Sequence, residues 1–241
     1  MPPLPPIPDA WLSPPSLTVA STVQRELAAR VTPEGAPGPL RTVAGVDVSS
    51  FPRDPAGRIF AAVVLLDADT LRPLETATAM RVAPIPYVPG FLGFREVPAL
   101  LAAFAELSRW PDLIVVDGHG VSHPRGLGIA AHLGVLLDRP TLGCAKSILV
   151  GAPAGPLADA RGATVPLIWK GRAIGTVLRT RPGVAPVYVS PGQRIGPEAA
   201  TEAVIRLAPR WRLPEPVRAA HAAANTFRRD WAAANGPAIK G

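Results

Sequence analysis

Three acidic residues stand at positions where a carboxylate could take part in chemistry. Asp117 ends the apolar run LIVV and is followed by the sequence Gly-His-Gly. A charge at the end of a buried strand is costly to desolvate unless a partner compensates it, and ligands of open α/β sheets collect at the carboxyl ends of strands. Asp47 is a lone carboxylate in the strand-like segment TVAGVDVS, and Glu96 opens a helical segment. These three acids are therefore candidates for a functional site.

Each acid also has an ordinary structural interpretation. Asp117 could be a turn or helix-cap aspartate, and Asp47 could face water from an edge strand. Glu96 could stabilise the first turn of its helix, where the helix dipole favours an acid. The glycines and the three histidines near Asp117 favour a site over a simple turn.

Carboxylates that a fold brings together repel one another, and a divalent cation relieves that repulsion. Ligands that are all oxygens suit Mg²⁺ or Mn²⁺ rather than zinc. The sequence contains no C-x-x-C or H-E-x-x-H motif, no G-x-x-x-x-G-K-[ST] loop and no G-x-S-x-G elbow. Zinc hydrolases, P-loop nucleotide hydrolases and Ser/His/Asp hydrolases are therefore poorly supported.

The elements that must position these acids follow from the periodicity of apolar residues. Segments 42–49, 58–67 and 76–82 are predicted strands with short links, typical of an antiparallel meander. In the first of them Val43, Gly45, Asp47 and Ser49 share one face. Further strands are predicted at 113–116, 140–145, 165–169, 176–179 and 187–189, with a loop of small residues over 151–162.

Helical spacing is found in five segments: 21–31 with Ser21 as N-cap, 96–107, 126–137, 197–207 and 216–233. The layout predicts an α/β protein with a mixed central sheet flanked by helices, and it resembles the ribonuclease-H-like fold. We expect one nuclease domain over residues 21–235, a proline-rich N-terminal arm over 1–20 and a C-terminal tail over 236–241.

The segment PIPYVPGFLGFRE holds an aromatic residue between prolines. Pro86 and Pro89 restrict the backbone around Tyr87, and Gly90 and Gly93 allow the chain to turn. The segment is either a loop folded over the core or a rigid wedge that projects its aromatic ring.

The net charge and the distribution of basic residues indicate what kind of partner the chain could bind. The formal net charge is +7, which permits a polyanionic partner. Residues 160–197 contain no acid but include Arg161, Lys170, Arg172, Arg179, Arg181 and Arg194, so they could form a phosphate-contacting face or a solvated surface. The single cysteine fits a reducing cytosol, and neither a membrane span nor a signal peptide is recognisable.

Four ordered motifs make the resemblance to a family specific. They are AGVDVS, PYVPGFLGFRE, VDGHGVSHPRGLGIAAHLGVLLDRPTLGCAKSILVG and LPEPVRAAH, which together extend from Ala44 to His221. With them the chain resembles endonuclease V (deoxyinosine 3′ endonuclease), the nuclease family that recognises deaminated purines. Ser50 departs from the family, which often has Phe after VDVS, but no residue carried over below is affected.

The resemblance implies roles for individual residues. Asp47, Glu96 and Asp117 would be the metal-site carboxylates, Lys146 an active-site lysine and His221 a catalytic or water-positioning residue. Tyr87 would be the wedge. The pocket for the hypoxanthine base would be lined by Gly118, Gly120 and Gly143, joined by Leu149.

The resemblance further implies a Mg²⁺-dependent endonuclease, with Mn²⁺ as a possible substitute. It would act on inosine-containing DNA or RNA, as a monomer in the cytoplasm, and cut the second phosphodiester 3′ to the lesion to leave 3′-hydroxyl and 5′-phosphate ends. The alternatives are an incision nuclease of the same fold without base specificity and a non-catalytic nucleic-acid-binding module. Retention of all three acids disfavours the second, and the wedge motif disfavours the first.

Four other residues have structural interpretations. His119 and His123 could be ligands, but histidines in a glycine-rich loop more often act as hydrogen-bonding struts. His132 is expected to be structural, and Cys144 is expected to be a small buried residue rather than a nucleophile.

Overall fold

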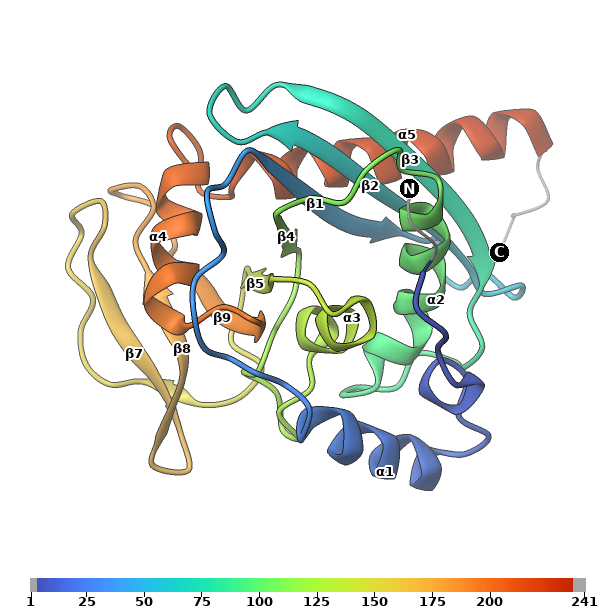
Figure 1. Cartoon of the computed structure of the whole chain (residues 1–241), viewed down its shortest axis with the longest axis horizontal. Coiled ribbons are helices and arrows are strands. Elements are labelled where there is room, and N and C mark those ends of the chain that lie inside the picture. Colours follow the sequence, from blue (N-terminus) through green and yellow to red (C-terminus); the bar gives the residue numbers. More distant parts are fainter. Residues whose placement is uncertain (1–3, 236–241) are drawn as a thin grey trace.

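The structure of the chain is a computed structural model that describes residues 4–235. Its centre is one nine-stranded mixed sheet with the strand order β3-β2-β1-β4-β5-β9-β8-β7-β6 (Figure 1). The strands are β1 (Thr42–Ser49), β2 (Arg58–Asp67), β3 (Pro73–Val82), β4 (Leu113–Val116), β5 (Thr141–Ala145), β6 (Ala152–Pro153), β7 (Thr164–Trp169), β8 (Arg172–Leu178) and β9 (Val187–Gln193).

Helices cover both faces of the sheet. They are the short η1 (Asp9–Trp11), α1 (Leu17–Ala28), α2 (Leu92–Ala105), α3 (Ile129–Leu137), α4 (Pro197–Leu207) and α5 (Glu215–Asn235). Side chains of α2 and α3 share one buried cluster with β1, β2 and β4, whereas side chains of α4 and α5 share a second cluster on the opposite face. Figure 1 shows α5 crossing behind β1 and β2. The expected α/β architecture with a flanked mixed sheet is confirmed.

The strand directions explain where a site can form. The first three strands form the expected antiparallel meander, and β1, β4 and β5 run parallel to one another. Their carboxyl ends therefore meet at one edge of the sheet, which is where side chains from strand termini can converge.

Successive side chains of β1 point to opposite faces of the sheet, and the two faces pack against different helices. Ala44 and Val46 pack in the cluster with α2 and α3, while Gly45 faces α5 so closely that a Cβ atom there would stand 1.8 Å from the carbonyl oxygen of Pro216. Asp47 and Ser49 lie on the same face as Gly45, as the sequence predicts. Because β1 is paired on both sides, Asp47 is not on an edge strand, and that interpretation is wrong.

Several helix starts differ from the sequence prediction, among them that of α3, which begins at Ile129 and not at 126. α1 begins at Leu17 and not at 21, because the side chain of Ser16 accepts a hydrogen bond from the backbone N–H of Val19 at 3.2 Å and so caps an additional turn. α2 begins at Leu92, which places Glu96 in its second turn. The interpretation of Glu96 as a first-turn acid is therefore wrong.

The arm and tail expected from the sequence differ in how far they can be described. Leu4, Ile7, Trp11 and Leu12 of the arm pack against the α2–α3 cluster. The tail over 236–241 lies outside the described residues. No helix within residues 4–235 is long and apolar enough to cross a membrane.

Candidate active site

Three of the expected site residues lie at the carboxyl ends of the parallel strands. Asp47 is near the end of β1, Asp117 directly follows β4, and Lys146 directly follows β5. Val46 is the register partner of Val116, and its carbonyl accepts a hydrogen bond from the N–H of Asp117 at 3.2 Å, so the two aspartates are lateral neighbours. The ammonium group of Lys146 donates to a carboxylate oxygen of Asp117.

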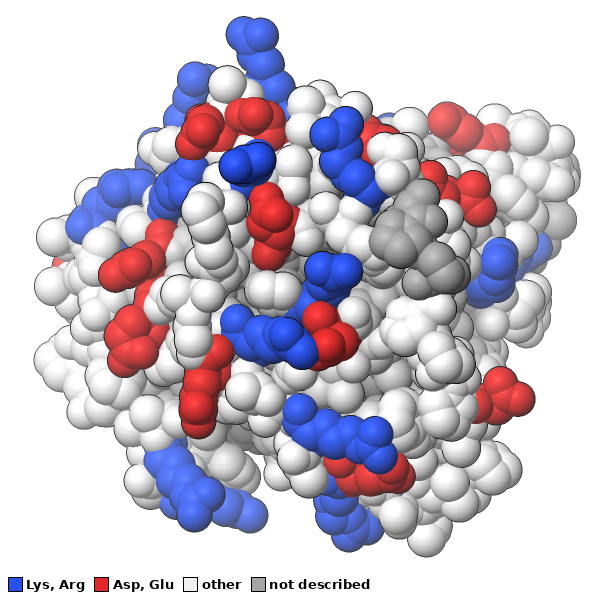
Figure 2. All heavy atoms as spheres, in the orientation of Figure 1, with Lys and Arg blue, Asp and Glu red and all other residues white. Residues whose placement is uncertain are grey.

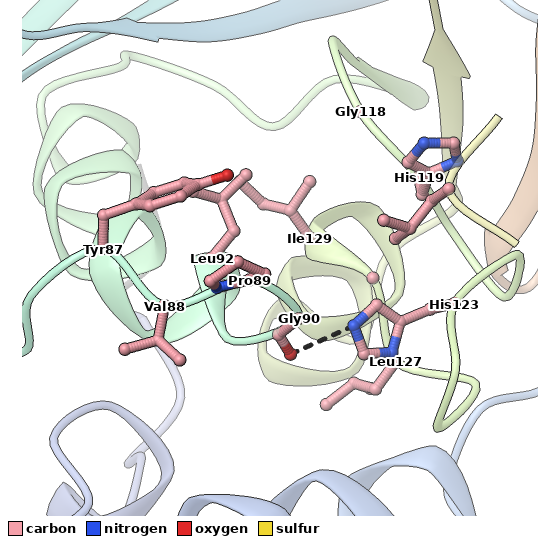
Figure 3. A pocket seen from close by; sticks show the side chains of 13 residues that line it. Tyr87, Val88, Pro89, Gly90, Leu92, Gly118, His119, His123, Leu127 and Ile129 are labelled. Atoms are coloured by element: carbon pink, nitrogen blue, oxygen red, sulfur yellow. Dashed lines mark hydrogen bonds between the residues drawn. The ribbon is translucent and has the colours of Figure 1, made fainter. Parts of the chain in front are cut away.

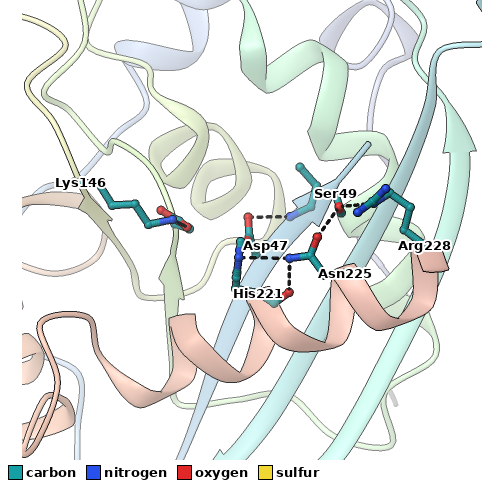
Figure 4. Close-up of polar contacts among 8 residues, drawn as sticks. Asp47, Ser49, Lys146, His221, Asn225 and Arg228 are labelled. Carbon is teal, nitrogen blue, oxygen red and sulfur yellow. Dashed lines mark hydrogen bonds and ion pairs between the residues drawn. The ribbon is translucent and has the colours of Figure 1, made fainter. Parts of the chain in front are cut away.

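Helix α5 brings His221 to this edge (Figure 4). His221 Nδ1 lies 2.7 Å from Asp47 Oδ2, and the histidine side chain is more than half exposed whereas that of Asp47 is largely buried. Asp47, Asp117 and His221 each offer one ligand atom, and these atoms all lie within 4.8 Å of one another. The structure thus places His221, for which the resemblance implies a catalytic or water-positioning role, among the groups that could hold a metal ion.

Glu96 approaches the same cluster from α2 but is not one of these three residues. Burial raises the pKa of Glu96 to about 8, and the charges of Asp47 and Asp117 contribute further to the rise. Burial and the charge of Asp117 also raise the pKa of Asp47, although hydrogen bonds from His221 and from the N–H of Val48 act in the opposite direction. Burial and the charges of the neighbouring acids therefore disfavour ionisation of both Asp47 and Glu96.

This donor set fits a hard divalent cation. Carboxylate oxygens dominate it, and both burial and the mutual repulsion of the acids raise the pKa values of Asp47 and Glu96, which a cation between the acids would offset. The ammonium group of Lys146 offsets one of the charges through its ion pair with Asp117.

A cavity of about 150 Å³ opens beside the cluster (Figure 3). A cavity of this size can hold one aromatic ring. Of the residues expected to bind the base, Tyr87, Gly118 and Leu149 line it, together with Leu92, His119, His123 and Ile129. Tyr87 and Leu149 are exposed at 67% and 44%, so they stand at its rim. Gly118 joins the cavity directly to Asp117.

Gly120 and Gly143 do not line this cavity. Both are buried, and they pack behind the loop that carries Gly118. A Cβ atom on Gly143 would stand 2.4 Å from the carbonyl oxygen of Gly118, and one on Gly120 would stand 1.9 Å from that of Pro191. Glycine is needed at both positions for the close approach of backbone, which fixes the loop that forms the cavity wall.

The remaining histidines and the cysteine have the structural roles that the sequence favours. His123 Nε2 lies 3.1 Å from the carbonyl oxygen of Gly90, which makes His123 a strut between two loops, and His119 Nδ1 lies 3.0 Å from Ser122 Oγ. His132 is buried with Nε2 3.0 Å from the carbonyl oxygen of Trp11. Cys144 is fully buried, and burial raises the pKa of its thiol to about 12.

The basic residues between 160 and 197 do not form one face. Arg161 and Arg179 donate to backbone carbonyls, and Arg194 binds both carboxylate oxygens of Asp138 at 2.7 and 2.6 Å. Figure 2 shows acidic and basic side chains interspersed on the face in view. Lys170, Arg172 and Arg181 form no ion pair with a residue in the described part of the chain, and these three stay available to phosphates.

Sequence reasoning missed the polar residues around His221. Asn225 Nδ2 lies 3.1 Å from His221 Nε2, and Asn225 Oδ1 accepts a hydrogen bond from Ser49 Oγ at 2.8 Å. Asn225 stands four residues after His221 on a predicted helix, so their proximity was available from spacing alone. The contact with Ser49 was not, because it depends on how α5 crosses β1.

The fold and the cluster of acids together define a class of protein. A mixed sheet begins with an antiparallel meander, its parallel strands deliver acids to one edge, and helices deliver Glu96 and His221. This is the arrangement of the ribonuclease-H-like nucleases.

Comparison with known proteins gives the family. The model of the Endonuclease V family matches residues 25–222. An Endonuclease V of Rhodospirillum centenum is 70% identical over 228 residues, which cover 95% of each chain. The chain therefore belongs to the Endonuclease V family, and it is an endonuclease.

Solved structures agree with this assignment. The crystal structure of the Endonuclease V from Streptomyces avermitilis superposes with a TM-score of 0.87 at 39% identity, and covers 93% of this chain and 97% of its own. Ciona intestinalis Endonuclease V, in complex with a 24mer DNA containing an inosine followed by a ribo-adenosine, has a TM-score of 0.74 at 22% identity and covers 89% of this chain and 98% of its own. At that identity the likeness shows the shared fold.

Proposed function

We propose that this endonuclease recognises a deaminated purine in nucleic acid and hydrolyses the second phosphodiester bond 3′ to it, with Mg²⁺ as cofactor, which Mn²⁺ can replace. The products carry 3′-hydroxyl and 5′-phosphate ends, and the reaction initiates repair of inosine-containing DNA. The observation that carries the proposal is the contiguity of the two parts of the site. The cavity ends at Gly118, and the carboxylate cluster begins at Asp117.

The cavity supports recognition of a base taken out of the stack. Enzymes that read a single base commonly extrude it into a pocket. Backbone of Gly90 and Gly118 together with apolar side chains lines this one, so a planar ring can lie close to the wall. Tyr87 at the rim would occupy the space that the base leaves in the stack. The Ciona relative bound to inosine-containing DNA supports the choice of hypoxanthine as the base.

The carboxylate cluster supports phosphodiester hydrolysis. Asp47, Asp117 and Glu96 would hold the divalent cation, which supplies positive charge at the phosphate and lowers the pKa of a bound water. Lys146 places an ammonium group beside Asp117, where it can balance negative charge that develops on the scissile phosphate. His221 stands exposed at the same edge and is hydrogen-bonded to Asp47 Oδ2, so it can help to position the attacking water through that carboxylate.

The alternatives make different use of the same features. An incision nuclease without base specificity has no need of an enclosed cavity beside its acids, and a binding module has no need of acids that resist ionisation together. We further propose that the enzyme acts as a monomer in the cytoplasm, and that RNA containing inosine is a possible second substrate.

Cleavage of matched oligonucleotides tests the proposal. Duplexes with one inosine or one adenosine, as DNA and as RNA, are incubated with Mg²⁺, and product ends are mapped. We expect a single nick in the inosine strand, and loss of that nick in Asp117→Asn, with affinity retained within about tenfold because phosphate and pocket contacts dominate binding. Equal cleavage of both duplexes would exclude base recognition, and normal nicking by Asp117→Asn would exclude the assigned cluster.

A further inference from the structure

A chain of side-chain hydrogen bonds leads from Arg228 to Asp47 by way of Ser49, Asn225 and His221 (Figure 4), and the chemistry above does not use Arg228, Ser49 or Asn225. Arg228 Nε donates to Ser49 Oγ at 2.8 Å, and Ser49 Oγ donates to Asn225 Oδ1 at 2.8 Å. Asn225 Nδ2 then lies 3.1 Å from His221 Nε2, and His221 Nδ1 lies 2.7 Å from Asp47 Oδ2.

Groups that can only donate or only accept a hydrogen bond set the direction of the bonds in this chain. A guanidinium can only donate, so Ser49 Oγ must accept from Arg228 and has its own hydrogen free for the amide oxygen of Asn225. The amide nitrogen of Asn225 faces His221, because it also donates at 2.9 Å to the backbone carbonyl of His221, which can only accept. Because an amide NH₂ group only donates, His221 Nε2 must accept, and the ring proton must be on Nδ1.

Further contacts hold the chain of bonds in place. The hydrogen bond from the Asn225 amide to the backbone carbonyl of His221 is a second restraint on this side chain, beside the one from Ser49. The guanidinium of Arg228 lies 4.9 Å above the ring of Phe51, and that ring packs edge-on against buried Phe60 with centroids 5.5 Å apart. The donor end is therefore anchored to the sheet.

From this geometry we infer that Asn225 is a positioning residue that fixes His221 in the tautomer with its proton on Nδ1, while Ser49 and Arg228 fix the orientation of the Asn225 amide. In this tautomer the ring donates to Asp47, with Nε2 occupied by Asn225. His221 then orients a cation-binding carboxylate through a hydrogen bond. This inference rests on the proposed function only in assigning that role to Asp47.

The tautomer can be measured without metal or substrate. Long-range ¹H–¹⁵N NMR spectra of the four histidines, recorded with chelator at about pH 8 where an ordinary imidazole is neutral, distinguish the two ring nitrogens. Comparison with His221→Ala assigns the signals of His221. We expect His221 to be protonated on Nδ1 and unprotonated on Nε2.

Asn225→Asp is the sharpest variant because it replaces the amide NH₂ with an oxygen that can only accept. A hydrogen should then be drawn to Nε2, and the tautomer with Nδ1 alone protonated should be lost. Ser49→Ala, which frees the amide to turn over, should give a mixture, and Ser49→Thr, which retains the hydroxyl, should restore the wild-type spectrum. Thr226→Ala is the matched control on α5, because Thr226 contacts Arg229 and lies outside this chain of bonds.

Turnover gives a second measurement. Asn225→Ala should lower kcat for nicking about tenfold, the lower end of the effects seen for groups that orient metal ligands, with little change in KM for DNA. Protonation of Nε2 in the wild type, or an unchanged tautomer in both Asn225→Asp and Ser49→Ala, would overturn the inference. Because the spectra need no substrate, failure of the inosine assay would leave this result standing, and the two failures are distinguishable.

Discussion

Tyr87 is the residue at which structure and expected activity meet most directly. Its ring is 67% exposed, at the rim of the cavity and between prolines that restrict the backbone. The sequence allowed either a loop folded over the core or a projecting wedge, and the exposed ring contradicts the first.

We expect Tyr87→Ala to weaken binding to inosine DNA by about ten- to a hundredfold, because stacking of an aromatic on a base contributes about 1–3 kcal/mol. The thermal midpoint should hardly change, since little of the ring is buried. Tyr87→Phe is the control, because it retains the ring and should bind normally. A large drop in midpoint with unaltered affinity would refute the wedge.

At the residue scale the sequence predicted which types of group would meet, but not all of their partners. Asp47, Asp117 and Lys146 each follow or end a recognisable strand, so their convergence was predictable from the parallel arrangement. The contact between Ser49 and Asn225 joins residues 176 positions apart, and nothing local in either segment encodes it. It arises only when α5 is seated on β1.

Helix α5 is seated at Gly45, and this close approach can be tested. A Cβ atom at position 45 would stand 1.8 Å from the backbone oxygen of Pro216, at the start of the helix that carries His221. Backbone cannot yield as a flexible side chain can, so Gly45→Ala must displace the helix, with a cost of about 1–3 kcal/mol typical of overpacking.

We expect Gly45→Ala to lose stability in urea unfolding and to lose nicking activity more than its remaining folded fraction explains, because His221 shifts away from Asp47. Gly38→Ala is the matched control, since a Cβ atom there would meet nothing within 4 Å. Wild-type stability and activity in Gly45→Ala would show that α5 is not held at this point.

Elements with a strong local pattern were predicted well, and those that depend on neighbours were not. The strands at 42–49 and 58–67 and the helix at 197–207 match the structure, because alternation or helical spacing marks them throughout. The start of α2 has no side-chain cap, so no capping residue in the sequence marks it. β6 is only two residues long and is defined by its pairing with β7. Such a short strand has no pattern of its own, and the sequence predicted a loop there.

At the scale of the whole molecule, buried histidines make the fold sensitive to acid. Burial lowers the pKa of His132 to about 4 and, helped by the charge of Arg125, that of His123 to about 4. In the unfolded chain both would titrate near 6.5. Below that pH the unfolded state binds protons that the folded state does not bind. The contribution of the neutral histidines to the free energy of unfolding is therefore fully present above pH 6.5 and is lost as the pH falls toward 4.

For His132 alone the loss should reach about 3 kcal/mol at pH 4. We therefore expect the unfolding free energy of His132→Gln to fall less steeply than that of the wild type between pH 6.5 and 4, while the difference between the two proteins stays constant above pH 7. Parallel curves over the whole range would show that His132 has the same pKa in the folded and unfolded states, so that burial does not lower it.

The net charge of +7 predicts that binding to DNA weakens with salt, and the structure indicates which charges contribute. Lys170 and Arg172 flank the turn between β7 and β8 and are exposed. Ile168, which lies next to that turn, pairs with Ala152 of β6. Ala152 follows Leu149, at the rim of the cavity, by three residues, so the turn is near the site.

The double variant Lys170→Gln, Arg172→Gln should reduce the slope of log affinity against log salt by about two, since each phosphate contact contributes about 0.9. Arg194→Gln should leave the slope unchanged, because Arg194 is occupied by Asp138. A slope unchanged in the double variant would place the DNA elsewhere on the surface.

The distance of 174 residues between His221 and Asp47 also has a meaning for synthesis. A ribosome releases the strands with Asp47, Asp117 and Lys146 well before the helix with His221, and chains begin to fold as they emerge. A growing polypeptide thus holds its acids without the helix that completes their surroundings. We therefore expect a nascent chain that has not yet released this helix to lack nicking activity.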